Sequence, residues 1–128
     1  MTKVREAMTE RVLTITPGRT LRDAARFMAD HNVGAAVIID PEQPGPGIIT
    51  ERDLVRAIAD GLNPKQAKAG VIMTAEPATV REEEDVSVVA LRMMRLGVRH
   101  LPVVDAAGRP IGLLSAGDLV TVLDRATS

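Results

Sequence analysis

Two short motifs carry the side chains of this chain that are best placed to do chemistry. Thr50-Glu-Arg-Asp53 and Ser115-Ala-Gly-Asp118 each place a hydroxyl three residues before a carboxylate. This spacing is typical of a capping box, in which both side chains bind the backbone at the start of a helix. A helix start also presents free N–H groups to a phosphate, and a carboxylate is a good acceptor for a diol. Capping and ligand binding are therefore compatible interpretations of the same residues.

Both motifs belong to a duplicated segment. Met8–Val55 aligns without a gap with Met73–Val120, and eleven of those 48 pairs are identical. An ungapped repeat indicates that one supersecondary unit was duplicated and that the two copies bury their apolar faces against each other. We therefore expect a pseudo-twofold axis relating two clefts, and we look for function there.

The hydrophobic pattern predicts the same order of elements in each half: strand, helix, strand, strand, helix. The predicted strands are Val12–Ile15, Ala35–Ile39, Ile48–Ile49, Ala78–Val80, His100–Val104 and Ile111–Leu114, and the predicted helices are Leu21–His31, Thr50–Asp60, Val86 to Gly97 and a last one from Ser115. This order indicates an α/β fold (α+β in some schemes). We divide it into repeat 1 at residues 1–61, a connector at 62–70 that has room for one helical turn, and repeat 2 at 71–128.

The composition excludes several classes of protein. The chain has 128 residues, 45% of them apolar, so it can build a packed core, and Phe27 is its one aromatic residue. Cysteine is absent, which excludes disulfides, thiolate nucleophiles and zinc sites with cysteine ligands. No nucleophile–base pair and no glycine-rich phosphate loop are visible, so we expect no catalytic residues and no enzyme. Two distant histidines do not make a metal motif.

Charge and hydropathy bear on the partners. The formal net charge is −1, and the cations are spread along the sequence without aromatic stacking platforms. Both features disfavour nucleic acid. No apolar run approaches the length of a membrane-spanning helix, and the first residues do not form a signal peptide. We therefore expect a cytoplasmic protein that does not bind membranes.

Three features together resemble the CBS domain, named for cystathionine β-synthase. The order of elements is the same, Val98-Arg-His-Leu-Pro-Val-Val-Asp105 is similar to the central strand of that family, and each half then has Gly-apolar-apolar-[Ser/Thr]-x-x-Asp, from Gly47 and from Gly112. The resemblance covers about Val4 to Asp124. It implies a tandem pair, called a Bateman module, which commonly binds adenine nucleotides or related adenosyl ligands between its repeats and regulates another protein.

The resemblance assigns ribose recognition to the two motifs. It implies that the carboxylates of Asp53 and Asp118 accept hydrogen bonds from ribose hydroxyls. The hydroxyls of Thr50 and Ser115 then help to hold ribose or phosphate. Without the resemblance, plain helix capping is the more common role of such motifs.

Phosphate binding is expected to be stronger in the second half than in the first, where it relies on the helix start after Thr50, on Arg52 or on Arg99. By family position, Arg99 and His100 reach the phosphates, and an arginine offers a planar fork of donors for that purpose. Gly34 and Ala35 stand at the matching places of the first half. The resemblance therefore implies two unequal sites, of which only the one at Asp118 has basic groups from its own repeat.

The base is expected to lie among aliphatic side chains, because the sequence has no tyrosine or tryptophan. The resemblance implies that the segment before each first strand crosses to the opposite site. Met8 and Leu13 then face Asp118, while Met73 and Ala78 face Asp53. The plain alternative for these four residues is core packing.

The expected ligand is AMP, ADP or ATP, with no cofactor required and with an unidentified protein as a further partner. Family pairs bury helices against a second pair, so we expect a homodimer. The chain looks like a stand-alone pair, and its connector is similar to the actinobacterial hypoxic response protein type, although cysteines found in some of those proteins are absent here. One alternative is a dimerisation scaffold that works without ligand. Another is an enzyme or nucleic-acid binder with a site that the sequence hides.

Overall fold

The structure is a computed structural model that describes the backbone of residues 1–127 and the side chains of residues 1–125. Ser128, with which the second predicted repeat ends, lies outside the described residues. The elements in chain order are α1 (Val4–Ala7), β1 (Thr14–Ile15), α2 (Leu21–Asp30), β2 (Ala35–Ile38), β3 (Gly47–Thr50), α3 (Glu51–Ala59), α4 (Ala69–Ile72), β4 (Val80–Arg81), α5 (Val86–Leu96), β5 (His100–Val104), β6 (Pro110–Ser115) and α6 (Ala116–Thr127).

The chain divides into two compact units. Unit 1 contains residues 1–12 and the chain from Ala78 onward, and unit 2 contains Leu13–Pro77. Each unit has one three-stranded sheet, with the order β4-β5-β6 in unit 1 and β1-β2-β3 in unit 2. In both sheets the first strand runs parallel to the central strand and the third runs antiparallel to it. The predicted α/β fold of two strand-helix-strand-strand-helix repeats is confirmed.

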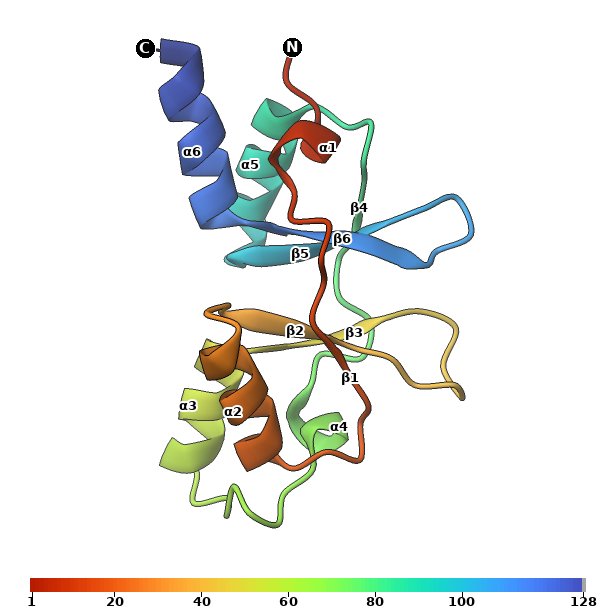
Figure 1. The fold of residues 1–128 in the computed structure, drawn as a ribbon, viewed down its shortest axis with the longest axis vertical. Coiled ribbons are helices and arrows are strands. Elements are labelled where there is room, and N and C mark those ends of the chain that lie inside the picture. The colour runs from red at the N-terminus through yellow and green to blue at the C-terminus, as the bar shows by residue number, and fades with distance from the viewer. Residues whose placement is uncertain (128) are drawn as a thin grey trace. The chain divides into compact units, whose positions relative to one another are not determined.

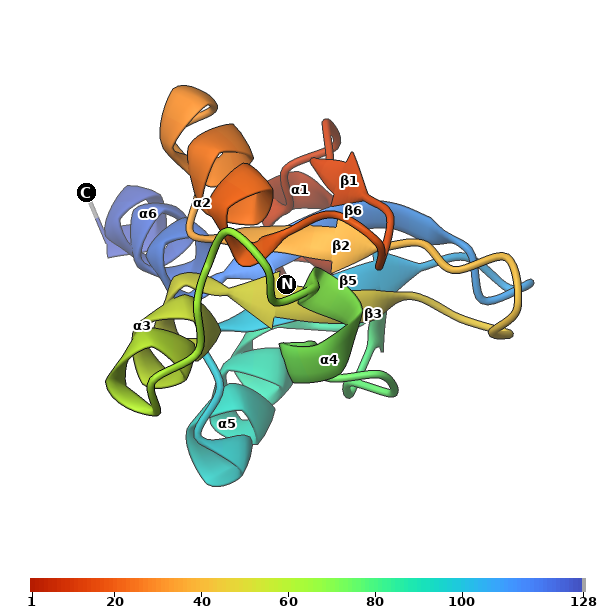
Figure 2. The ribbon, with the colours of Figure 1, turned by 90° about the horizontal axis from the view of Figure 1, so that it is seen from below.

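Each unit packs its two longer helices on one face of its own sheet, α5 and α6 in unit 1, α2 and α3 in unit 2 (Figures 1 and 2). Each has its own core of buried aliphatic side chains. Leu114 on β6 and Ile49 on β3, which are equivalent in the repeat, are both 0% exposed. Phe27 is only partly buried at the edge of the unit 2 core. The expectation of an aliphatic core is confirmed.

Local sequence explains where the helices begin and end. The Thr20 hydroxyl caps α2 by accepting the Asp23 N–H at 3.1 Å. The helices α3 and α5 are followed by Gly61 (φ 86°) and Gly97 (φ 67°), in the left-handed region that glycine adopts at little cost. His31 is the C-cap of α2, and its Nδ1 lies 2.8 Å from the Phe27 carbonyl oxygen.

The structure differs from the sequence-based prediction at the start of each half. The first strands are only two residues long, and they begin at Thr14 and Val80, because they pair with the central strand over just those residues. Two short helices, α1 and α4, precede them and were not predicted, since four residues are too few to show a helical period. In the connector, Ala67 N–H donates to the Asn63 carbonyl at 2.8 Å, which closes the expected single turn.

Candidate functional site

The Asp118 site lies in unit 1, where β6 ends and α6 begins. Ser115 N–H donates to Asp118 Oδ2 at 2.9 Å, and Asp118 N–H donates to Ser115 Oγ at 3.0 Å. This reciprocal pair is the capping box that the sequence predicts. It uses only one carboxylate oxygen, and within the described residues Oδ1 of Asp118 has no hydrogen bond. The aspartate is half-buried, so a ligand can reach it.

The Asp53 site repeats this geometry in unit 2, between β3 and α3. Thr50 N–H donates to Asp53 Oδ2 at 2.8 Å, and Asp53 N–H donates to Thr50 Oγ1 at 3.2 Å. Asp53 is also half-buried, and its Oδ1 likewise makes no hydrogen bond to the part of the chain that the structure describes. Each unit therefore presents a fixed carboxylate with one oxygen left for a further donor.

A backbone hydrogen bond ties each helix start to the residue before the central strand. Ala116 N–H donates to the Arg99 carbonyl at 2.9 Å, and Glu51 N–H donates to the Gly34 carbonyl at 3.0 Å. This bond holds the backbone of Arg99 beside the first turn of α6, and Arg99 is exposed. At the equivalent place in unit 2, Gly34 offers only backbone.

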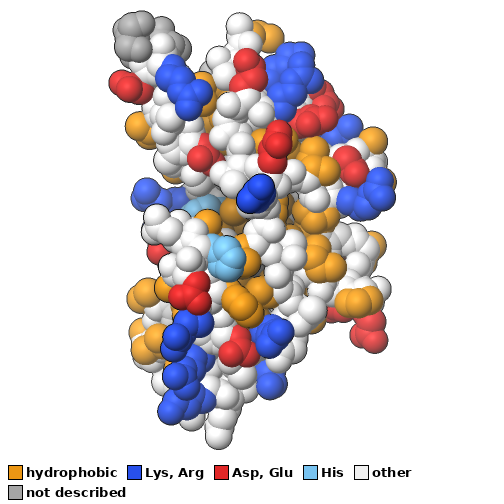
Figure 3. Space-filling view, viewed as in Figure 1, with side chains coloured by type: hydrophobic (Ala, Val, Ile, Leu, Met, Phe, Trp, Pro, Cys, Tyr) orange, Lys and Arg blue, Asp and Glu red, His pale blue; other side chains and the backbone are white. Residues whose placement is uncertain are grey.

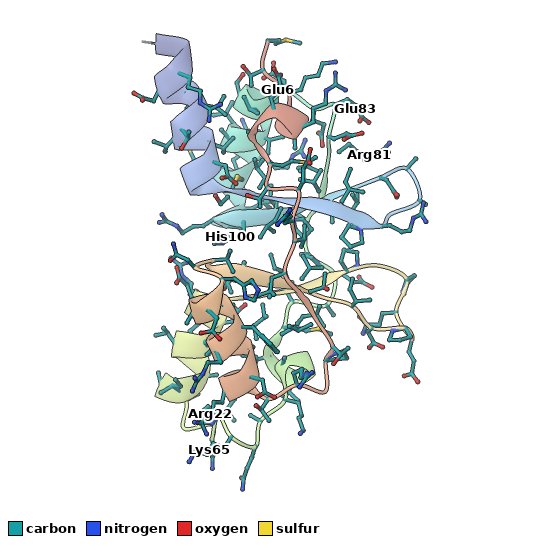
Figure 4. The ribbon with its side chains drawn as sticks, viewed as in Figure 1. Glu6, Arg22, Lys65, Arg81, Glu83 and His100 are labelled. Atoms are coloured by element: carbon teal, nitrogen blue, oxygen red, sulfur yellow. The ribbon has the colours of Figure 1, made fainter. Side chains whose placement is uncertain are left out.

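The central strand faces the motif directly in both units. His100, at the start of β5 (Figure 4), is the register partner of Ser115, as Ala35 is of Thr50. His100 is half-buried and Ala35 is buried. The structure therefore brings Arg99, His100, Ser115 and Asp118 together in unit 1, as the sequence-based assignment requires.

Each unit also contains the segment that leads into the other repeat. Thr9 and Leu113 exchange two backbone hydrogen bonds of 2.9 and 3.0 Å in unit 1. Thr74 and Ile48 exchange two of 2.9 Å in unit 2. Met8 is consequently in the unit of Asp118, and Met73 in the unit of Asp53. The role of both methionines in lining a base stays a prediction.

Two glycines on the third strands make room for these methionines. A Cβ at Gly112 would lie 2.7 Å from Met8 Sδ, and one at Gly47 would lie 2.9 Å from Met73 Sδ. Real Cβ atoms do not approach other atoms so closely. Sequence reasoning did not assign a role to either glycine, although their identity at the repeat offset was the available signal.

Leu13 and Ala78 lie in other units than the methionines with which they were grouped. Leu13 belongs to unit 2, where it packs against the core, and Ala78 belongs to unit 1, where it is exposed. Within its own unit, neither residue accompanies the aspartate that it was expected to face. Their roles in lining a base stay predictions.

The helix starts differ in one more respect. The second helical residue is Gly117 in α6 and Arg52 in α3. The backbone N–H of each has no hydrogen bond within the described residues. Gly117 has no side chain to cover this N–H, whereas Arg52 is an exposed residue with a cationic side chain. Such free N–H groups favour an anion.

The ion pairs among the described residues lie outside both sites. Arg92 donates to Glu84 at 2.8 Å, and the pKa of the Glu84 carboxyl is held below its ordinary value chiefly by this hydrogen bond. Arg81 pairs with Glu83 at 3.3 Å and Arg109 with Asp105 at 3.2 Å. Backbone donation from Arg109 is the main reason why the pKa of Asp105 is lowered.

Two further features were searched for within the described part of the chain. No helix there is both long enough and apolar enough to cross a membrane. Within the same residues, no three side chains of the types His, Asp or Glu come together in a group that could hold a metal ion.

Known proteins share both the sequence pattern and the fold. An uncharacterized protein of Methanopyrus kandleri is 37% identical over 112 residues, which are 87% of this chain and 57% of that protein. The chain thus spans little more than half the length of this relative. A CBS domain protein from Pyrobaculum aerophilum, complexed with AMP, has a TM-score of 0.85 at 30% identity, covering 99% of this chain and all of the other.

A second solved structure is a CBS domain pair in complex with 5′-methylthioadenosine and S-adenosyl-L-methionine. It has a TM-score of 0.88 at 27% identity, and 98% of each chain is covered. The sequence itself matches the CBS domain family over residues 4–60 and again over residues 69–125. The chain therefore belongs to the CBS domain family and contains two CBS domains in tandem.

Proposed function

We propose that this chain is a ligand-sensing regulatory module that binds an adenine nucleotide, or a related adenosyl ligand, at the Asp118 and Asp53 sites. The observation that carries the proposal is that only one of the two carboxylate oxygens of each aspartate has a hydrogen bond within the described residues. Each aspartate gives one oxygen to the helix cap and keeps the other for a donor from outside. The AMP complex of the Pyrobaculum aerophilum protein and the adenosyl complex of the second CBS pair support the choice of ligand.

The free oxygen fits the ribose, because a fixed carboxylate oxygen accepts hydrogen bonds from a cis diol. Preorganisation by the capping box means that the carboxylate loses little freedom on binding. The ligand phosphate then lies against the start of the helix that carries the aspartate. In this arrangement Thr50 and Ser115 hold the ribose or phosphate with their hydroxyls.

We assign AMP, ADP or ATP to the Asp118 site in particular. The Arg99 carbonyl accepts a hydrogen bond from Ala116 N–H, so the exposed Arg99 starts close to the free N–H of Gly117, and a phosphate that its guanidinium group reaches gains charge-assisted hydrogen bonds. The Asp53 site has Gly34 in place of Arg99 and relies on the helix start and on Arg52. We therefore expect the Asp118 site to bind phosphorylated ligands first and the Asp53 site to tolerate uncharged adenosyl ligands.

Isothermal titration with AMP, ADP, ATP, 5′-methylthioadenosine and S-adenosylmethionine tests the proposal. Asp118→Ala and Asp53→Ala should each remove one site, since hydrogen bonds to a charged acceptor contribute about 1.5–3 kcal/mol each. Asp23→Ala is the matched control, because Thr20-Leu-Arg-Asp23 has the same spacing at the start of α2 but no position in either site. Unchanged affinity and stoichiometry in both site variants would leave the motifs with capping alone.

A dimerisation scaffold is the second candidate, and one observation favours it. Val55 and Ile58 on α3 are 67% and 61% exposed, and their repeat equivalents on α6, Val120 and Leu123, are 65% and 51% exposed. Apolar side chains exposed at equivalent places of both repeats indicate faces that are covered in an assembly.

We propose a homodimer on this ground. Ile58→Glu combined with Val120→Glu should then give a monomer in light scattering, while Arg56→Glu with Thr121→Glu on the same helices should leave the dimer intact. A monomeric wild-type chain at micromolar concentration would contradict the dimer. Nucleotide titration of the monomeric variant separates the two candidates, because a scaffold binds no ligand in either state.

A further inference from the structure

A cluster of cations lies in unit 2 where the connector packs against the start of α2. Four backbone hydrogen bonds of 2.7–2.9 Å join residues 17–22 to residues 64–70. Figure 4 places Arg22 and Lys65 at this end of unit 2, and Figure 3 shows Lys and Arg side chains gathered there. We call this cluster the basic surface, and its members are Arg19, Arg22, Arg26, Lys65 and Lys68.

The cations of the basic surface are exposed, and within the described residues they form no ion pairs. The three ion pairs found among the described residues are all in unit 1. Arg19 contacts the ring of Phe27, with its guanidinium carbon 5.6 Å from the ring centroid. The only carboxylate in segments 19–26 and 64–68 belongs to Asp23.

Local electrostatics disfavours this arrangement. Arg22 lies in the first turn of α2, where the helix dipole opposes a positive charge. Arg22 and Arg26 are four residues apart on the same helix, a spacing at which like charges repel. The repeat equivalents of Arg19, Arg22 and Arg26 are Glu84, Ser87 and Leu91, so the duplicated backbone does not require these cations.

Apolar side chains border the basic surface. Val71, one turn after Lys68, is 75% exposed, and Leu62, two residues before Pro64, is 38% exposed. A phosphate backbone has no group that would cover them, and the surface offers no free aromatic face for a nucleobase. A peptide with both carboxylates and aliphatic side chains matches cations and apolar neighbours together.

We propose that the basic surface of unit 2 binds an acidic peptide segment of a partner protein, one that carries aliphatic side chains between its carboxylates. The surface uses none of the residues of the Asp53 or Asp118 sites. It therefore gives the module a place to hold a target that is separate from its ligand sites.

The test measures binding of a fluorescently labelled peptide in which glutamate and leucine alternate, by anisotropy at low and at high salt. Arg22→Glu combined with Lys65→Glu should weaken binding about tenfold or more, because two attractive contacts become repulsive. The backbone bond from Arg22 N–H to Pro64 is unaffected, and the melting temperature should stay equal or rise as repulsion is relieved. Arg5→Glu with Arg11→Glu in unit 1 is the control, with the same change in net charge and full binding.

Several results would overturn the proposal. Equal loss of binding in the test and control pairs would reduce the effect to net charge. Tighter binding of an oligothymidine of equal charge, or undiminished binding when serine replaces leucine in the peptide, would contradict the assignment to an acidic, aliphatic peptide. Salt-sensitive self-association that disappears in the double variant would assign the surface to a second copy of this chain.

Discussion

Units 1 and 2 attach the loop before their first long helix to that helix with different side-chain contacts. In unit 1, Glu84 before α5 binds Arg92 within that helix at 2.8 Å. At the equivalent positions of unit 2, Arg19 lies over the ring of Phe27. One contact is an ion pair and the other is a cation–π contact, yet both fasten the loop before a helix to the second turn of that helix.

This comparison shows which interactions a duplicated fold keeps. The backbone contacts recur almost unchanged: the capping boxes, the bond from the helix start to residue 34 or 99, and the two-way bridge to the incoming segment. Most of these contacts join backbone N–H and C=O groups. The capping boxes also need a side-chain oxygen at the N-cap and another three residues later. Side chains outside these contacts diverged, as Arg99 did from Gly34 and Glu84 from Arg19.

The largest expected effect comes from the two cores. Leu114→Ala and Ile49→Ala each remove a fully buried side chain at equivalent positions and should lower the free energy of unfolding by about 2–5 kcal/mol. Urea titration of both variants also compares the units. If the units unfold together, each substitution shifts the one transition, whereas two transitions that respond separately would show independent units. Val88→Ala on the exposed face of α5 is the control for side-chain truncation.

The glycines beneath the methionines should give the next largest effect. Gly112→Ala and Gly47→Ala place a Cβ 2.7 and 2.9 Å from a methionine sulfur, and about 3.1 Å from a backbone carbonyl oxygen in each case. Because the carbonyl is fixed by the bridge, we expect a loss of about 1–3 kcal/mol in both units, measured by thermal unfolding. Gly18→Ala, which meets nothing within 4 Å, is the control. Stable Gly112→Ala protein would mean that Met8 moves aside freely.

Arg99→Ala separates the two sites. If Arg99 binds the phosphate, the variant should bind AMP about tenfold more weakly at the Asp118 site while its affinity for adenosine stays nearly the same. Gly34→Arg is the converse experiment and should raise the affinity of the Asp53 site for AMP. Calorimetry with both ligands measures the change, and equal weakening for AMP and adenosine would contradict a role at the phosphate.

The smallest expected effect concerns how stability depends on pH. The Glu84–Arg92 contact of unit 1 and the Arg19–Phe27 contact of unit 2 should differ in this respect. The folded-state pKa of Glu84 is lowered, so its contribution is fully present above the unfolded pKa of about 4.3 and is lost as the pH falls through the folded value. Glu84→Gln should therefore cost up to about 1 kcal/mol at pH 7 and nothing in strong acid. Phe27→Leu should cost about 0.5–1 kcal/mol at both pH values, because its contact with Arg19 contains no carboxyl group. Parallel pH profiles of the two variants would contradict this difference.

The local parts of the candidate sites were predictable because they depend on neighbours in sequence. A hydroxyl three residues before a carboxylate specifies a capping box within one turn of helix, and both predicted boxes formed. The strand His100–Val104 was predicted at its observed bounds, since a buried strand has a continuous apolar pattern. The short first strands were not, because two residues at a sheet edge have no period.

The sequence by itself determined the duplication, the aliphatic cores and the two Ser/Thr-x-x-Asp motifs, because each of them depends only on the types of residue and their spacing along the chain. Only the tertiary structure decided how the chain divides into units: residues 1–12 join the second half through Thr9 and Leu113, so the compact units differ from repeats 1–61 and 71–128. These long-range contacts are made by backbone N–H and C=O groups, which are the same in every residue. Their partners therefore leave almost no trace in the sequence beyond the glycine that lets each methionine approach.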